Sequence, residues 1–247
     1  MILIYEQRSF NTSASILAKR EAVKRVARLY RDMTAHQPRT RGRPPAADRA
    51  NVTAAALRLL DEAGLDALTM RKLATAVGVQ VGTLYGYFPT KRALLTAMAE
   101  AMLNGCRDAA EGVPQPRERV WALAKSLRTA LLSYRDGARV YAGTHATGPN
   151  TLGFADALNG ALREAGLDAP AAMKSALLIL HFATGHVLEE QAAIQSGPEL
   201  PADIDNLRQA IRKGDYPHLA QAQDHLTGMD LTELFEQGLR LLTSELS

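Results

Sequence analysis

The chain has 247 residues, 47% of them hydrophobic and 22% charged, and this length is sufficient for one large or two ordinary domains with a full hydrophobic core. Aromatic residues make up only 5%, and such a composition favours packed helices over sheets. The net charge of +3 is uneven, because residues 1–45 contain ten Lys/Arg and three Asp/Glu, while residues 46–247 contain nineteen and twenty-three. A basic end of this kind is typical of a segment that contacts phosphates or of a solvated tail.

A single cysteine, Cys106, excludes an internal disulfide framework and a pair of cysteine metal ligands. This usage fits a reducing compartment, so we expect a cytoplasmic protein. The opening "MILIYEQRSF" has too short an apolar run for a signal peptide, and no membrane partner is expected. We also expect no cofactor and no metal.

The first predicted helix covers residues 13–33, where apolar residues recur at helical spacing and basic residues occupy another face. A start of translation at Met33 is the alternative. The segment "QPRTRGRPP", residues 37–45, follows this helix. Its composition fits a linker, a disordered basic spacer or an arm that grips a partner.

Three short helices and a long one are predicted next, and each has a local start or stop signal. The first, within residues 47–64, ends at Gly64, and the second is capped by Thr69 and closed by Gly78. A third runs through "QVGTLYGYF" and ends before Pro89. Thr90 then caps a long helix predicted to extend to residue 110.

The remainder of the chain continues the helical pattern. Glycines at 137, 143 and 148 predict a kinked stretch over residues 135–150, and residues 196–228 are expected to be looser. Further helices are predicted over residues 117–134, 151–166, 169–195 and 230–246. The predicted fold class is therefore all-α, and the helix at 169–195, apolar on most sides, must be buried against several neighbours or a second subunit.

The second and third short helices have the pattern of a helix-turn-helix. Ala74 is small where the two helices would cross, Gly78 allows the turn, and Val79 and Leu84 would be buried to fix the second helix. This leaves most of residues 80–87 free to face a DNA groove or backbone. The pattern alone fits equally well three packed helices of a bundle.

The stretch "LTMRKLATAVGVQVGTLYGYFPTKRALL" resembles the DNA-binding domain of the TetR family of bacterial repressors, and the match covers residues 48–95. Two later stretches, "LLSYRDGARVYAGT" and "HFATGHVLEEQ", resemble the ligand-binding and dimerisation core of the tetracycline-repressor subfamily. The resemblance implies a basic arm at residues 1–45, a three-helix DNA-binding domain at 46–92 and an α-helical ligand-binding and dimerisation domain at 93–247.

The resemblance also implies which residues contact DNA. Arg71 occupies a base-reading position, where a guanidinium can bind guanine through two hydrogen bonds. Val81 and Gly82 depart from the subfamily, which has a polar reader and a proline there, so a different operator sequence is expected. The DNA-contacting residues expected in this domain are Arg71, Gln80, Val81, Gly82, Thr83, Tyr85, Tyr87 and Lys91.

The ligand half departs further from the subfamily, which holds a magnesium–drug chelate through an imidazole. Tyr141 stands at that position here, and a protonated phenol is a poor magnesium ligand. Leu123 and Leu127 replace an amide and an aromatic residue, so a more apolar pocket is expected. The residues expected to bind the ligand are Leu123, Leu127, Tyr141, Thr144, His145, His181 and Glu189.

Metal binding by the long apolar helix is an alternative, since His186 and Glu189 are three residues apart and share a face. Two ligands do not close a site, and buried histidines are commonly satisfied by a hydrogen bond.

The sequence therefore predicts a homodimeric repressor, not an enzyme, that binds a palindromic DNA operator and is released by a small lipophilic effector. A constitutive or architectural DNA-binding protein is the alternative, and a helical enzyme or ligand carrier is disfavoured because no catalytic constellation is found. The stretch "RGRP" resembles the AT-hook, which implies that Arg41 and Arg43 contact the minor groove; a charge-only arm is the other possibility.

Overall fold

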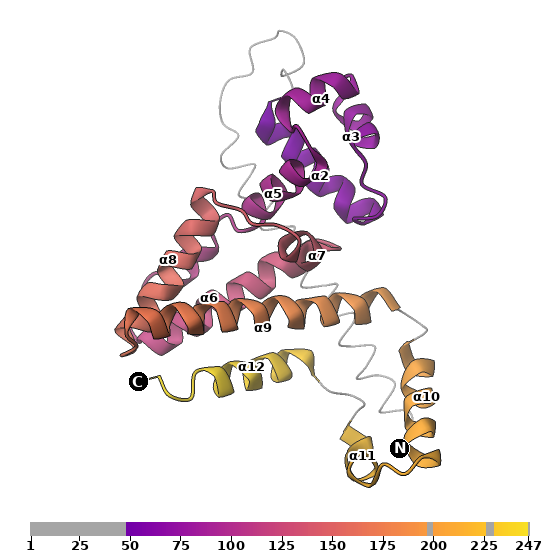
Figure 1. Ribbon diagram of the computed structural model, residues 1–247, viewed down its shortest axis with the longest axis vertical. Coiled ribbons are helices and arrows are strands. Elements are labelled where there is room, and N and C mark those ends of the chain that lie inside the picture. Colours follow the sequence, from indigo (N-terminus) through magenta and orange to yellow (C-terminus); the bar gives the residue numbers. More distant parts are fainter. Residues whose placement is uncertain (1–47, 197–199, 226–229, 247) are drawn as a thin grey trace.

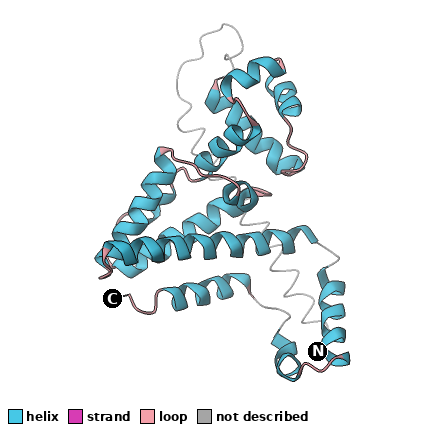
Figure 2. Cartoon of the chain, in the orientation of Figure 1, coloured by secondary structure: helices cyan, strands magenta, loops and turns pink. Residues whose placement is uncertain are grey.

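The computed structural model describes residues 48–196, 200–225 and 230–246, and within these ranges all regular structure is helical (Figures 1 and 2). The all-α fold class is thereby confirmed. The helix predicted at residues 13–33, and the basic segment with Arg41 and Arg43, lie outside the described residues.

The first three described helices end and begin at the predicted signals. They are α2 (Arg49–Ala63), α3 (Met70–Val77) and α4 (Val81–Tyr87). Thr69 caps α3 by accepting a hydrogen bond from the Lys72 N–H at 3.2 Å, and Gly78 ends it in the left-handed region at φ 71°. Ala74, Leu84 and Phe88 are buried, so the turn and the second helix are fixed by packing.

Helix α5 (Lys91–Met102) begins at Thr90, as predicted, but the prediction that it continues to residue 110 is wrong. Gly105 adopts φ 78° three residues after the helix ends, and a 3₁₀ helix, η1 (Cys106–Ala110), follows. A left-handed residue cannot continue an α-helix, so the chain changes direction here.

The larger helical body is built from α6 (Pro116–Leu132), α8 (Pro149–Glu164), α9 (Ala169–Ser196) and α12 (Leu231–Leu242). Helix α6 packs against α8 and α9, and α12 lies along α9 (Figure 1). The predicted kinked stretch contains a short helix, α7 (Gly137–Ala142), which packs on α5, α6 and α9.

Helix α9 is long and apolar enough, by length and composition alone, to cross a membrane. In this fold it serves as a central helix, because one face, which includes Ala176, Ile179, Ala183 and Val187, is buried against the other helices. Its opposite face is exposed.

Residues 200–225 are more regular than predicted. They form α10 (Leu200–Lys213), α11 (Pro217–Ala222) and a short 3₁₀ helix, η3 (Gln223–His225), and Figure 1 shows α10 and α11 standing away from the larger body. The apolar residues Ile204, Leu207 and Ile211 recur at three- and four-residue steps, which is the helical signal that the abundance of polar residues hid.

Candidate DNA-reading surface and effector site

The exposed side of α3 and α4 carries most of the predicted DNA-contacting residues. Arg71 on α3 is exposed, as are Gln80, Gly82, Thr83 and Tyr85 at and within α4. Beyond α4, Lys91 is exposed at the first position of α5. These exposed groups come from three consecutive helices, α3, α4 and α5.

Val81 and Tyr87 differ from the other predicted contacts because both are half-buried and pack against the hydrophobic core. Leu84, on the inner face of the same helix, is fully buried. At the end of α4, the guanidinium of Arg49 lies 4.9 Å from the centre of the Phe88 ring, which joins the start of α2 to the end of α4. The recognition helix is thus held from beneath, with its outer face free.

The predicted effector residues Leu123 and Leu127 on α6 and Tyr141 on α7 belong to the hydrophobic core or pack against it, and we call these three residues the apolar wall. Leu123 and Leu127 are fully buried, and Thr144 is nearly so, with its hydroxyl donating to the Tyr141 carbonyl at 3.1 Å. Burial, and to a lesser extent the nearby Cys106, raises the pKa of the Tyr141 phenol. Its phenol therefore keeps its proton and is a poor ligand for a hard metal ion.

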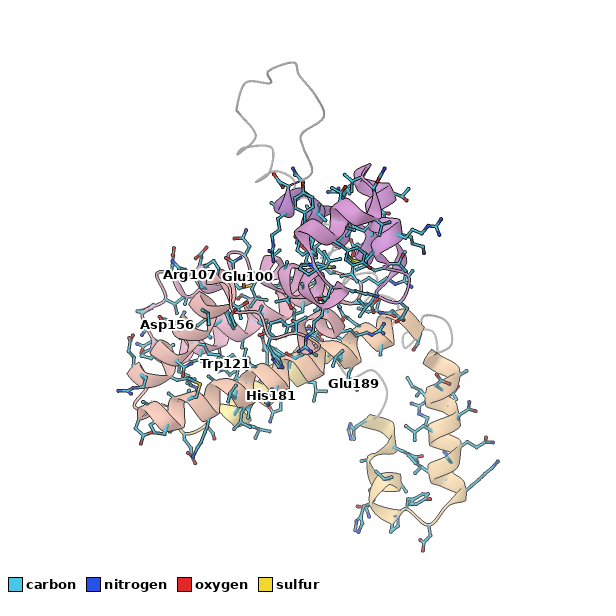
Figure 3. All side chains as sticks on the ribbon, turned by 45° about the horizontal axis from the view of Figure 1, so that its top comes forward. Glu100, Arg107, Trp121, Asp156, His181 and Glu189 are labelled. Carbon is cyan, nitrogen blue, oxygen red and sulfur yellow. The ribbon has the colours of Figure 1, made fainter. Side chains whose placement is uncertain are left out.

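Three other predicted effector residues are not brought to this wall within the chain. His145 is exposed, and His181 and Glu189 lie on the exposed face of α9 (Figure 3). The buried face of α9, which packs on α6 and α8, is formed by other residues. The predicted set is therefore divided between an apolar wall and an open helix face.

His186 is paired differently from the metal alternative. Its Nε2 lies 2.8 Å from the Leu231 carbonyl, to which it donates as a neutral ring, and the nearby carboxylate, at 3.8 Å, belongs to Glu190 and not to Glu189. The ring also contacts Phe182 and Phe235. In the part of the chain that the structure describes, no three His, Cys, Asp or Glu side chains converge as a metal site would require.

A buried ion pair that sequence reasoning missed joins α6, α9 and α12. Glu190 is completely buried, and its carboxylate accepts two hydrogen bonds from the Arg128 guanidinium, one of them at 2.8 Å. Arg128 also donates to the Thr232 hydroxyl at 3.1 Å and lies over the Phe235 ring. No local sequence signal identifies this pairing, because its members are 62 and 104 residues apart.

Asp136 forms a second missed cluster, where the two helical units meet. Its buried carboxylate accepts a hydrogen bond at 2.7 Å from the N–H of Leu65, in the loop between α2 and α3. Arg139 bridges Asp136, at 3.3 Å, to Asp66, at 3.0 Å, and Gln195 of α9 donates to Asp136 at 3.3 Å. The sequence around Asp136 and Gly137 predicted only a kink.

The protonation state of Asp136 is consistent with a role in joining the two helical units. Burial alone would raise the pKa of its carboxyl, but hydrogen bonds from Leu65, Gln195 and Arg139 outweigh burial, and the pKa is lowered. The carboxylate is therefore charged at neutral pH, and it connects the loop between α2 and α3 to α7 and α9 through charged hydrogen bonds.

A three-helix unit with an exposed recognition helix, attached to a larger helical body with an apolar wall, defines a helix-turn-helix DNA-binding regulator. The family model for bacterial regulatory proteins of the tetR family matches residues 52–98, and the model for the tetracyclin repressor-like C-terminal domain matches residues 112–246. The chain belongs to the TetR family, so the resemblance inferred from the sequence is confirmed, and by family it is an effector-responsive DNA-binding repressor.

Individual relatives agree with this assignment. The tetracycline repressor class A from transposon 1721 of Escherichia coli is 40% identical over 200 residues, which cover 79% of this chain and 88% of the relative. The crystal structure of a possible TetR family regulator from Streptomyces coelicolor A3(2) is 54% identical, with a TM-score of 0.73 over 80% of this chain and 97% of that one. ActR of Streptomyces coelicolor, in complex with actinorhodin, is 25% identical, with a TM-score of 0.71 over 80% and 95%.

Proposed function

We propose that this protein is a homodimeric, cytoplasmic repressor that binds a palindromic operator and is released by a small lipophilic effector. The observation that carries the proposal is the exposed outer face of α3 and α4. A recognition helix anchored by the fully buried Leu84 and Phe88 leaves Arg71, Thr83 and Tyr85 free for DNA.

Each predicted contact has a chemical role in DNA recognition. Arg71 reads a guanine edge, Thr83 and Tyr85 contact phosphate or thymine methyl groups, and Lys91 contacts phosphate. Val81, half-buried and apolar, contributes at most a thymine methyl contact, so the operator differs from that of the tetracycline repressors. Gln80, Gly82 and Tyr87 complete the surface.

A homodimer is supported by the exposed apolar side chains of α9 and α12. On α9, Met173, Leu177 and Leu178 are 52%, 45% and 56% exposed, and on α12 Leu241 is 68% exposed. A two-fold interface through these helices buries them and places two recognition helices about 34–36 Å apart, in successive major grooves. His181 and Glu189 lie on the same face of α9, so they take part in effector binding only across this interface.

The apolar wall of the fully buried Leu123 and Leu127 and the half-buried Tyr141 supports a lipophilic effector, with Thr144 as a polar contact. These residues can contact an organic effector without a metal ion. The ActR–actinorhodin complex, from a relative of the same fold, is an example of a family member that binds an organic ligand.

The Asp136 cluster supplies a physical link between effector and DNA. Movement of α7 or of the end of α9 alters the hydrogen bonds that Asp136 makes with Arg139, Gln195 and the Leu65 N–H. To turn a population of repressor that is mostly bound to DNA into one that is mostly free, the effector must bind the released conformation more tightly than the DNA-binding conformation. The required difference in binding free energy is about 5 kcal/mol.

Electrophoretic retardation of a fragment of the protein's own promoter, with and without lipophilic compounds, tests the proposal. We expect specific retardation that a subset of compounds abolishes. If DNA binds and no compound changes the affinity, a constitutive regulator is the better description, and the effector half of the proposal is wrong.

The basic arm is proposed to add affinity through Arg41, Arg43 and their neighbours. Removal of residues 1–45 is expected to weaken operator binding and to flatten its dependence on salt, since fewer counterions are released. Unchanged affinity and salt dependence, measured on the same fragment, would reduce the segment to a linker.

A further inference from the structure

Glu100, near the end of α5, caps the first turn of α8 from outside that helix. Its carboxylate accepts hydrogen bonds from the N–H groups of Asn150 at 2.6 Å and Thr151 at 3.1 Å, and from the Thr151 hydroxyl at 2.6 Å. The Glu100 backbone carbonyl accepts another from the Asn150 side chain at 3.1 Å. Both its side chain and its backbone therefore tie α5 to α8 (Glu100 is labelled in Figure 3).

Helix α8 has no cap of its own. The first N–H groups of any helix lack partners within it, and the residue at the cap position of α8, Gly148, has no side chain to supply one. Pro149, which follows, has no N–H. An anionic oxygen is especially favourable at this positive end of a helix, so Glu100 supplies what the local sequence lacks.

Gly148 leaves the room that this carboxylate occupies. A Cβ atom at position 148 would lie 2.5 and 2.8 Å from the two carboxylate oxygens of Glu100. The backbone itself does not demand glycine, because Gly148 has φ −81°. The two positions are complementary, and a side chain at 148 would displace the carboxylate without straining the backbone.

The contact lies between the two functional regions of the protein. Helix α5 follows the recognition helix after three residues and buries Leu94 and Met98 in the hydrophobic core. Helix α8 follows the segment that carries Thr144, at the edge of the apolar wall. A few residues of chain therefore separate the candidate effector wall from the partners of Glu100.

We propose that Glu100 is a positioning residue, which holds α5, and with it the recognition helix, in the DNA-binding orientation for as long as the first turn of α8 stays in place. The inference rests on the proposed function. An effector that moves residues 141–148 draws the N–H groups of Asn150 and Thr151 away from the carboxylate and frees α5 to reorient. Repression is then released partly through this contact.

Operator binding by variants of the full chain provides the first test. Without effector, Glu100→Ala is expected to bind the promoter fragment about tenfold more weakly, as the loss of a charged hydrogen-bond set implies. Gly148→Ala should lower operator affinity to a similar degree. The double variant should bind the operator as well as the weaker-binding of the two single variants, because both changes remove the same contact. Glu100→Gln, which keeps one acceptor oxygen, should retain intermediate affinity.

A matched control separates positioning from stability. Asp168 caps α9, where its carboxylate accepts the Ala171 N–H at 2.8 Å. Asp168→Ala also removes a helix cap and is expected to lower the melting temperature, but it should leave operator affinity unchanged. Equal losses of affinity in Asp168→Ala and Glu100→Ala would overturn the proposal.

A distance measurement tests the orientation without DNA. Spin labels at Ala76→Cys on α3 and Asp156→Cys on α8, both exposed positions, report the separation of the two units, while Cys106 is buried. Labelled protein is diluted in unlabelled protein so that each dimer carries one labelled protomer. Glu100→Ala is expected to shift or broaden the distance distribution, and an unchanged distribution overturns the proposal. This result stands even if the wild type fails to bind its promoter, which would refute only the proposed function.

Discussion

The buried side chain of His186 has a structural role and not a metal-binding one. Burial lowers the pKa of the imidazole, and the neighbouring Arg128 lowers it further, while Glu190 and the Leu231 carbonyl oppose the shift without cancelling it. The unfolded chain therefore binds the proton more readily than the folded one.

The lowered pKa predicts a pH dependence. Because the folded pKa lies below the ordinary value of 6.5, the stability associated with neutral His186 is present above pH 6.5 and is lost as the pH falls through that value towards the folded pKa. Urea unfolding between pH 8 and pH 5 should show this decline in the wild type. His186→Gln, which can still donate to the Leu231 carbonyl, should show a smaller decline, and identical curves for the two proteins would contradict the assignment.

At the scale of single elements, the recognition helix α4 carries a feature that its fold does not need. Gly86 is exposed, its φ is not in the left-handed region, and a Cβ placed there meets no atom within 4 Å. Glycine in a helix is less stable than alanine by about 0.5–1 kcal/mol. We propose that Gly86 is kept because α4 approaches the DNA closely at this position.

Gly86→Ala is therefore predicted to have opposite effects on stability and on DNA binding. The free energy of unfolding should rise by about 0.5–1 kcal/mol, while the added methyl group weakens operator binding. Gly160→Ala on α8, where a Cβ also meets nothing within 4 Å, should give the gain in stability without the loss in affinity. Thermal unfolding and promoter retardation measure the two effects, and undiminished binding by Gly86→Ala would count against a close approach.

The elements also show how far sequence reasoning reaches. Caps and turns are local, so Thr69, Gly78 and Thr90 could be assigned from their neighbours alone, and the described helices begin or end there. The early end of α5 depends on the left-handed Gly105, which spacing of apolar residues did not reveal. The bond between Asp136 and Leu65 joins residues 71 positions apart, and only the tertiary fold brings them together.

The candidate site was predictable to a similar degree. The outer face of α4 follows from helical periodicity, since Leu84 had to face the core. The effector set was harder, because His181 and Glu189 share a sequence stretch with buried residues of α9 yet lie on its open face. Which side of a largely apolar helix faces a partner is decided by packing.

In the proposed dimer, two protomers associate through α9 and α12. Leu178→Glu, at an apolar position of α9 that is 56% exposed, is predicted to yield a monomer, because a charge would be buried at the two-fold interface. Leu152→Glu, at an equally exposed position of α8, should remain a dimer. Sedimentation distinguishes the two, and a dimeric Leu178→Glu protein would place the interface elsewhere.

The central claim is that the outer face of α3 and α4 reads a specific operator. The most direct measurement is the affinity of the purified wild-type chain for a duplex from its own promoter, compared with a scrambled duplex of equal length and with the Arg71→Ala variant. We expect the wild type to bind the promoter duplex far more tightly than the scrambled one, and Arg71→Ala to lose about 1–3 kcal/mol of that preference. Equal affinity of the wild type for both duplexes, or no binding to either, would contradict it.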